Sequence, residues 1–121
     1  MHYASQAYRK TALETANPRE LEASLLLQAA AKLQDVHDSW RDKPIGLNDA
    51  VTFNRKLWTI LIDAVMKDEN KLPVEVRSNI TRLGMYVMSE TFALMTKPMP
   101  SHLEAIIKVN RSIAAGLRAK A

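Results

Sequence analysis

Residues 17–40 read NPRELEASLLLQAAAKLQDVHDSW, and this stretch decides the class of the fold. Asn17 can cap a helix with its side chain, Pro18 suits the first helical position, and Glu20 follows the cap by three residues. Steps of 100° per residue place most of the apolar residues on one stripe: Leu21, Leu25, Ala29, Leu33, Val36 and Trp40, widened by Leu26, Leu27 and Ala30. We therefore predict an amphipathic helix over residues 18–40.

Three more helices are predicted after it. One begins near Asn48 and runs to about Asn70, and Leu72-Pro73 starts another that reaches about Thr96. Ser101-His102-Leu103-Glu104 has the spacing of a capping box, so the last helix is expected from Ser101 to Gly116, a suitable C-cap. Their inward stripes are Leu47, Val51, Trp58, Ile62 and Val65; Val76, Ile80, Leu83, Val87 and Leu94; and Leu103, Ile106, Ile107, Ala114 and Leu117. Four helices joined by short links predict an all-α antiparallel bundle.

Length and composition favour one helical domain over residues 1–121. Apolar residues make up 47% of the chain and charged residues 25%, with only 3 Gly and 5 Pro. No apolar run approaches the ~20 residues that cross a bilayer, and the N-terminus lacks the apolar core of a secretory signal. The sequence thus predicts a soluble protein in the cytoplasm.

The first sixteen residues precede the bundle. Tyr3 to Glu14 can form a short helix, whose apolar residues are mostly small alanines beside Tyr8 and Leu13. A short helix with so little apolar surface gains little from packing, so we expect residues 1–16 to dock weakly.

The residue types argue against catalysis. The chain has no cysteine, and its three histidines, His2, His37 and His102, do not form a metal-binding pair at helical spacing. It has no glycine-rich phosphate loop and no nucleophile motif. We expect no enzyme activity, no metal and no cofactor.

Two asparagines project from apolar stripes. Asn54 lies between Val51 and Trp58, and Asn110 lies between Ile107 and Ala114. A buried amide must find hydrogen-bond partners, so these side chains are expected to bond to each other or to nearby backbone. We prefer a structural role in fixing helix register over a ligand site, because no titratable group accompanies them.

The helix predicted after Pro73 carries a second apolar stripe, formed by Met85, Met88, Phe92 and Met95. Neighbouring helices on both sides would explain it most simply. A groove for an amphipathic helix of a partner is the sharper hypothesis, since methionine and aromatic side chains adapt to foreign helices. The basic residues Arg55, Lys56 and Arg111 would then present charge at the rim.

Four segments of the chain are informative together: Tyr8 with residues 17–22, residues 53–60, Leu72-Pro73 with Asn79-Ile80 and Leu83-Gly84, and Ile107 with residues 110–117. The resemblance that they carry is to the FlaF family of flagellar regulators from alphaproteobacteria, and it covers nearly the whole chain. It implies a cytoplasmic, non-enzymatic protein that promotes flagellin production and export and opposes a second small regulator, FlbT. Members of the family are also described as binding flagellin.

Two other functions stay open. The chain could act as an RNA-binding regulator of flagellin messenger, but its basic residues are dispersed, it has 7 aromatic residues, and it contains no RNA-binding motif. It could also work only as a heteromer with FlbT, with the two-sided helix as the interface. Direct nucleic-acid binding is the less favoured hypothesis.

Overall fold

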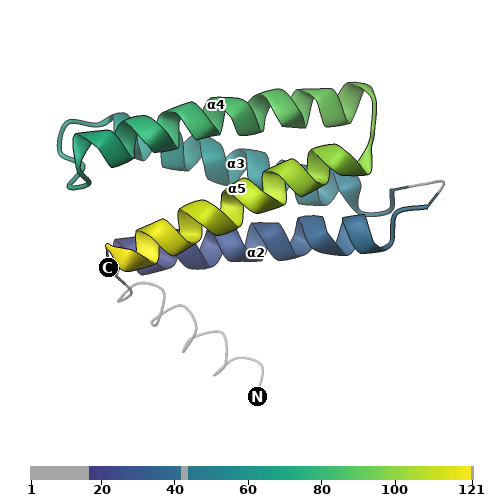
Figure 1. Cartoon of the computed structure of the whole chain (residues 1–121), viewed down its shortest axis with the longest axis horizontal. Helices are drawn as coiled ribbons and strands as arrows, with labels where there is room; N and C mark the ends of the chain where they lie inside the picture. Colours follow the sequence, from purple (N-terminus) through teal and green to yellow (C-terminus); the bar gives the residue numbers. More distant parts are fainter. Residues whose placement is uncertain (1–16, 42–43, 121) are drawn as a thin grey trace, which may run out of the picture.

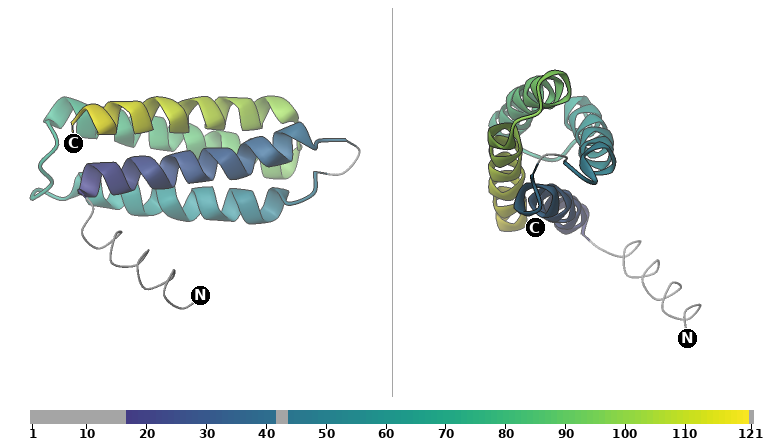
Figure 2. Two further views of the ribbon diagram at one scale, coloured as in Figure 1. Left: turned by 90° about the horizontal axis from the view of Figure 1, so that it is seen from below. Right: turned by 90° about the vertical axis from the view of Figure 1, so that its right-hand side faces the viewer.

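Four helices account for most of residues 17–41 and 44–120, which are the residues that the computed structural model describes. They are α2 (Pro18–Asp38), α3 (Leu47–Met66), α4 (Val74–Thr96) and α5 (Pro100–Ala119). Each packs mainly on its two neighbours in the order α2, α3, α4, α5 and back to α2, as the end-on view in Figure 2 shows. The described residues form an antiparallel four-helix bundle without a β-strand, as predicted (Figure 1). The expected short helix in residues 3–14 lies outside them.

Helix α2 begins as its sequence predicts. The Asn17 side chain accepts a hydrogen bond of 2.8 Å from the backbone N–H of Arg19, and Pro18 occupies the first turn. This bond satisfies one of the N–H groups that a helix start leaves unpaired. Helix α3 begins differently, because its cap is Gly46 at φ 82°, a backbone conformation that glycine adopts without steric cost.

Two predictions about α5 are wrong. Ser101 does not cap this helix, since α5 begins one residue earlier at Pro100, with Met99 extended before it. Proline is favoured at the first helical position, which places Ser101 inside the first turn. Gly116 does not end the helix either, because α5 continues to Ala119 and Gly116 has no positive φ. A helical glycine costs about 1 kcal/mol but does not stop a helix that is packed on both sides of it.

The link between α3 and α4 is held by side chains of polar residues. Helix α3 ends at Met66, four residues before the predicted end, where Arg77 of α4 donates hydrogen bonds to the carbonyls of Val65 (2.7 Å) and Lys67 (2.8 Å). Asn70 donates to the carbonyl of Ala64 and accepts from the N–H of Leu72. These bonds satisfy carbonyls that a helix end leaves free, so the chain can turn here.

The core confirms most of the predicted stripes, with exceptions on α2, α3 and α4. Leu21, Leu25 and Trp40 are only partly buried, and Trp40 follows the end of α2. Ile62 of α3 and Val76 and Leu83 of α4 are also only partly buried. The buried face of α2 is instead rich in small residues: Ala23, Leu26, Ala29, Ala30, Leu33 and Val36. Small side chains let α2 approach a neighbour closely, and α5 is the helix that it packs against most extensively.

Gly84 allows a second close approach, between α4 and α3. A Cβ atom at this position would lie 2.6 Å from Cδ1 of Ile62 and 3.2 Å from Cε3 of Trp58. The absence of a side chain at Gly84 therefore makes room for the indole ring of Trp58, the largest side chain in the core.

Candidate functional site

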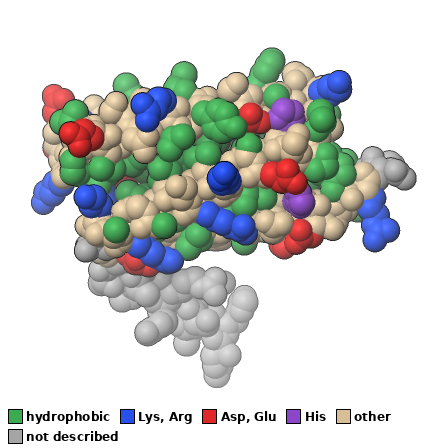
Figure 3. Space-filling model, in the orientation of Figure 1, with side chains coloured by type: hydrophobic (Ala, Val, Ile, Leu, Met, Phe, Trp, Pro, Cys, Tyr) green, Lys and Arg blue, Asp and Glu red, His purple; other side chains and the backbone are tan. Residues whose placement is uncertain are grey.

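Helix α4 exposes apolar side chains along its outer face. The exposed fractions are 64% for Met85, 72% for Phe92 and 46% for Met95. In Figure 3, apolar side chains project from the upper edge of the molecule, where α4 lies. Neighbouring helices on both sides of α4 do not cover Met85 and Phe92, so the simpler of the two interpretations does not explain this stripe.

Met88 differs from the other three residues of this stripe. It is partly buried and packs against the core cluster. A step of 100° per residue places Met88 nearer than Met85 or Phe92 to Gly84 and Val87, which are on the buried side of α4. Met88 therefore belongs partly to the core, and only its outer surface is available to a ligand.

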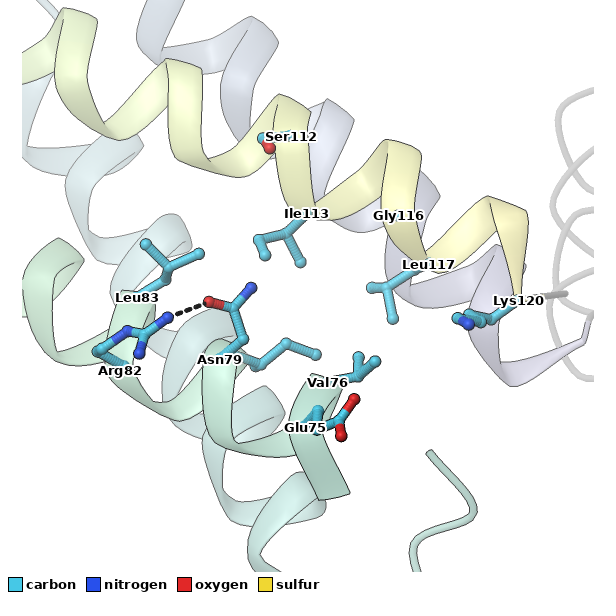
Figure 4. Close-up of a pocket in the computed structure, with 11 residues that line it drawn as sticks. Glu75, Val76, Asn79, Arg82, Leu83, Ser112, Ile113, Gly116, Leu117 and Lys120 are labelled. Atoms are coloured by element: carbon cyan, nitrogen blue, oxygen red, sulfur yellow. Dashed lines mark hydrogen bonds between the residues drawn. The ribbon is translucent and has the colours of Figure 1, made fainter. Parts of the chain in front are cut away.

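A groove runs along the other flank of α4, between α4 and α5. It has a volume of about 480 Å³. In Figure 4, Leu83 and Val76 of α4 point toward Ile113 and Leu117 of α5 across it. The polar residues that line it are Glu75, Asn79, Arg82, Ser112 and Lys120, and Arg82 donates a hydrogen bond of 2.7 Å to Asn79. An apolar floor with a polar rim suits one side of an amphipathic helix.

The course of α5 explains this groove. Near its start, Nδ1 of His102 lies 2.6 Å from Oε2 of Glu90 on α4. Near its end, Arg118 forms an ion pair of 2.9 Å with Glu20 of α2 instead. Helix α5 therefore stays beside α2, which it also contacts near its start through Glu104 and His37, and Figure 1 shows it separating from α4 toward its end.

Gly116 lies where these two helices separate. A Cβ atom at this position would have no neighbour within 4 Å. Helical periodicity does not predict this groove, because it places Val76, Leu83 and Leu117 on inward stripes. The one signal in the sequence was Gly116, a glycine within the last predicted stripe, but a glycine at this position also suits the end of a helix.

The predicted basic residues do not form one cluster. Arg55, Lys56 and Arg111 are all exposed. Arg55 precedes Ile62 by seven residues, about two turns, so it lies on the side of α3 that faces α4. Arg111 donates a hydrogen bond of 3.4 Å to Gln34 of α2 and so lies on the opposite flank of the bundle. Of the three, only Arg55 is placed beside α4, because Lys56 lies about 120° around α3 from Ile62.

The residues predicted to have a structural role meet in the centre of the bundle. Asn54, Trp58 and Asn110 are fully buried. The Trp58 indole N–H donates to Oδ1 of Asn110 at 2.8 Å, and Nδ2 of Asn110 donates to Oδ1 of Asn54 at 2.7 Å. Nδ2 of Asn110 also lies 3.4 Å from the carbonyl oxygen of Leu26. The two amides therefore satisfy each other inside the core and are not open to a ligand.

The titratable residues pair at the surface. Nε2 of His37 lies 3.0 Å from Oε1 of Glu104, and this hydrogen bond raises the pKa of His37 above its ordinary value. Across residues 17–41 and 44–120, no group of three or more His, Cys, Asp or Glu residues could hold a metal ion. None of the helices in the same ranges is long and apolar enough to span a membrane.

The fold and its surface define a four-helix bundle with an exposed apolar helix face and an adjacent groove between α4 and α5. The family model of the flagellar protein FlaF matches residues 4–117. The chain therefore belongs to the FlaF family, as the resemblance in its sequence indicated. No curated protein and no solved structure matches it.

Proposed function

We propose that this FlaF-family protein is a non-enzymatic, cytoplasmic module that binds flagellin and promotes its synthesis and export. Membership in a flagellar family supports a role in the flagellar system. One observation about the molecule carries the proposal of a protein ligand: Met85 and Phe92 on α4 are exposed to solvent. Burial of apolar side chains of this size is favourable. Such exposure is typical of a surface that a partner covers.

The spacing along α4 favours a helical partner. Met85, Met88, Phe92 and Met95 follow each other at intervals of three, four and three residues. This is the pattern by which one helix packs against another along a continuous seam. The seam spans eleven residues, or about 15 Å of helix. Flagellin before polymerisation would offer amphipathic terminal helices that need an apolar surface of this kind.

The experiment combines two exposed residues of the stripe. The double variant Met85→Gln and Phe92→Gln is expected to keep its fold and to lose flagellin affinity by about 30-fold or more, equivalent to roughly 2 kcal/mol. Ile60→Gln is the matched control, because Ile60 on α3 is 68% exposed and lies outside the stripe. Affinity is measured by calorimetric titration with flagellin, and folding by thermal melting.

Three outcomes would contradict the proposal. Equal affinity of the double variant and the Ile60 control would exclude the α4 stripe as the flagellin site. Binding to flagellin messenger that falls steeply with salt, with none to flagellin, would indicate an RNA-binding regulator. Flagellin binding that appears only when FlbT is added would indicate that the heteromer is the active species.

A further inference from the structure

The apolar surface of α4 continues onto α3. Ile62 of α3 packs against Gly84 of α4, since a Cβ atom at Gly84 would lie 2.6 Å from Cδ1 of Ile62. Met66 follows Ile62 by four residues, about one turn, and so lies on the same side of α3. The side chain of Met66 is 66% exposed. Both helices therefore contribute apolar side chains to this flank of the bundle.

Hydrogen bonds and helix geometry place these side chains next to each other. Arg77 of α4 donates to the carbonyls of Val65 (2.7 Å) and Lys67 (2.8 Å), the two neighbours of Met66. Met88 follows Gly84 by one turn, so it lies on the side of α4 that faces Ile62. We call the combined set the α3–α4 surface: Ile62, Met66, Met85, Met88, Phe92 and Met95.

Arg55 lies beside the α3–α4 surface. It precedes Ile62 by seven residues, about two turns, on the side of α3 that faces α4. Because α3 and α4 run antiparallel, this spacing places Arg55 about level with Thr91, between Met88 and Met95. The positions one turn away from Arg55 on its own helix carry no charge: Val51, Thr52, Trp58 and Thr59.

Acidic side chains of the two helices are engaged elsewhere. Asp63 of α3 lies 3.5 Å from Lys67, and Glu90 of α4 lies 2.6 Å from His102 of α5. Glu75 lines the α4–α5 groove, on the other flank of α4. A carboxylate that pairs with Arg55 would therefore come from a bound partner.

We propose that the helix bound by this protein lies over the α3–α4 surface and places a carboxylate against Arg55. This placement rests on the proposed function, in which flagellin supplies the helix, and adds the position and the charge of the bound segment. Two helices support an apolar stripe on both of its sides, whereas a single helix offers one row of contacts. The α5 side of α4 suits an apolar stripe less well, because Glu75, Asn79 and Arg82 line it.

Two exposed residues of α3 test the position of the bound helix. Met66→Gln is expected to weaken flagellin binding about tenfold in calorimetric titration, whereas Ile60→Gln should leave it unchanged. These side chains are 66% and 68% exposed on the same helix, so the chemical change and the exposure are matched. Ile60 points away from α4 and lines a groove between α2 and α3 with Leu21 and Leu57.

A second pair of residues tests the charge of the bound helix. Arg55→Glu should also weaken flagellin binding about tenfold, because it brings two carboxylates together. Lys56→Glu makes the same kind of charge reversal at the next residue, about 120° around α3 from Ile62, and should have little effect. Salt screens ion pairs, so the affinity of the natural protein should fall more steeply with salt than that of Arg55→Gln.

The outcomes distinguish this placement from the proposed function. Flagellin that does not bind the natural protein would contradict both. Binding that is weakened by Met85→Gln with Phe92→Gln, but not by Met66→Gln or Arg55→Glu, would overturn only the placement. A dimer of the natural protein that Met66→Gln dissociates would assign the α3–α4 surface to a second copy and would also overturn it. Thermal melting establishes that each variant remains folded.

Discussion

Asn110 of α5 donates a hydrogen bond of 2.7 Å to Asn54 of α3, and both side chains are fully buried. These helices lie across the bundle from each other, since α5 packs mainly on α2 and α4. The Trp58 indole has an N–H and no acceptor, so it fixes the oxygen of Asn110 toward itself and the amide nitrogen toward Asn54. One residue pair thus determines how two diagonal helices align.

Removal of either amide should destabilise the protein, and Asn110 should matter more. Asn110→Ala removes the hydrogen-bond partner of both the Trp58 N–H and Oδ1 of Asn54. Asn54→Ala removes only the acceptor for Nδ2 of Asn110. We expect a loss of about 3 kcal/mol for the first and about 1 to 2 kcal/mol for the second in urea unfolding. The exposed residue Asn48 supplies the control, and Asn48→Ala should change stability by less than about 0.5 kcal/mol. Equal, small effects at all three sites would show that the network contributes nothing to stability.

The two helical glycines should respond in opposite directions to alanine. At Gly84 a new methyl group would meet Ile62 and the rigid ring of Trp58, so overpacking should outweigh the gain in helix propensity and cost about 1 to 2 kcal/mol. At Gly116 the methyl group enters open space, and Gly116→Ala should stabilise the protein by about 0.5 to 1 kcal/mol. Thermal melting of both variants measures the difference, and a stabilising Gly84→Ala would contradict the close packing of α3 and α4.

Substitutions at Met85 and Met88, two neighbouring residues of the α4 stripe, should differ in their effect on the free energy of unfolding. Met88→Gln places a polar group against the core and should cost about 1 to 2 kcal/mol. Met85→Gln, at an exposed site on the same helix with the same chemical change, should stay within about 0.5 kcal/mol of the natural protein. Chemical denaturation measures both. If Met85→Gln were the more destabilising of the two, the assignment of the outer face of α4 would be wrong.

His37 should contribute to stability at acidic pH. Its hydrogen bond to Glu104 raises its pKa above 6.5 in the folded protein. The stabilisation from this hydrogen bond is therefore fully present at a pH below the pKa that His37 has in the unfolded chain. It disappears as the pH rises through the higher pKa that His37 has in the folded protein. Glu104→Gln should move the pKa of His37 back toward its ordinary value in an NMR titration, while Asp63→Asn on distant α3 should leave it unchanged. If the pKa of His37 were unchanged in Glu104→Gln, Glu104 would not be the cause of the raised pKa.

The sequence alone predicted the class of the fold, the family and the buried asparagines. Helix α2 could be placed from Asn17 and Pro18 because a cap acts on its own first turn and depends on no distant residue. The central position of Asn54 and Asn110 followed from helical periodicity, which fixes where a side chain points relative to its own stripe.

Only the tertiary structure decided which apolar residues are covered. Leu21 and Leu83 occupy core positions in the helical repeat, yet both line grooves, because burial also requires a neighbouring helix at the right distance. At Leu83 that distance depends on how far α5 diverges from α4 toward its end, and this course follows from packing between helices rather than from the periodicity of any one of them. The same reason explains Gly116: a local rule interpreted it as a helix end, while contacts on both sides of it keep α5 helical to Ala119.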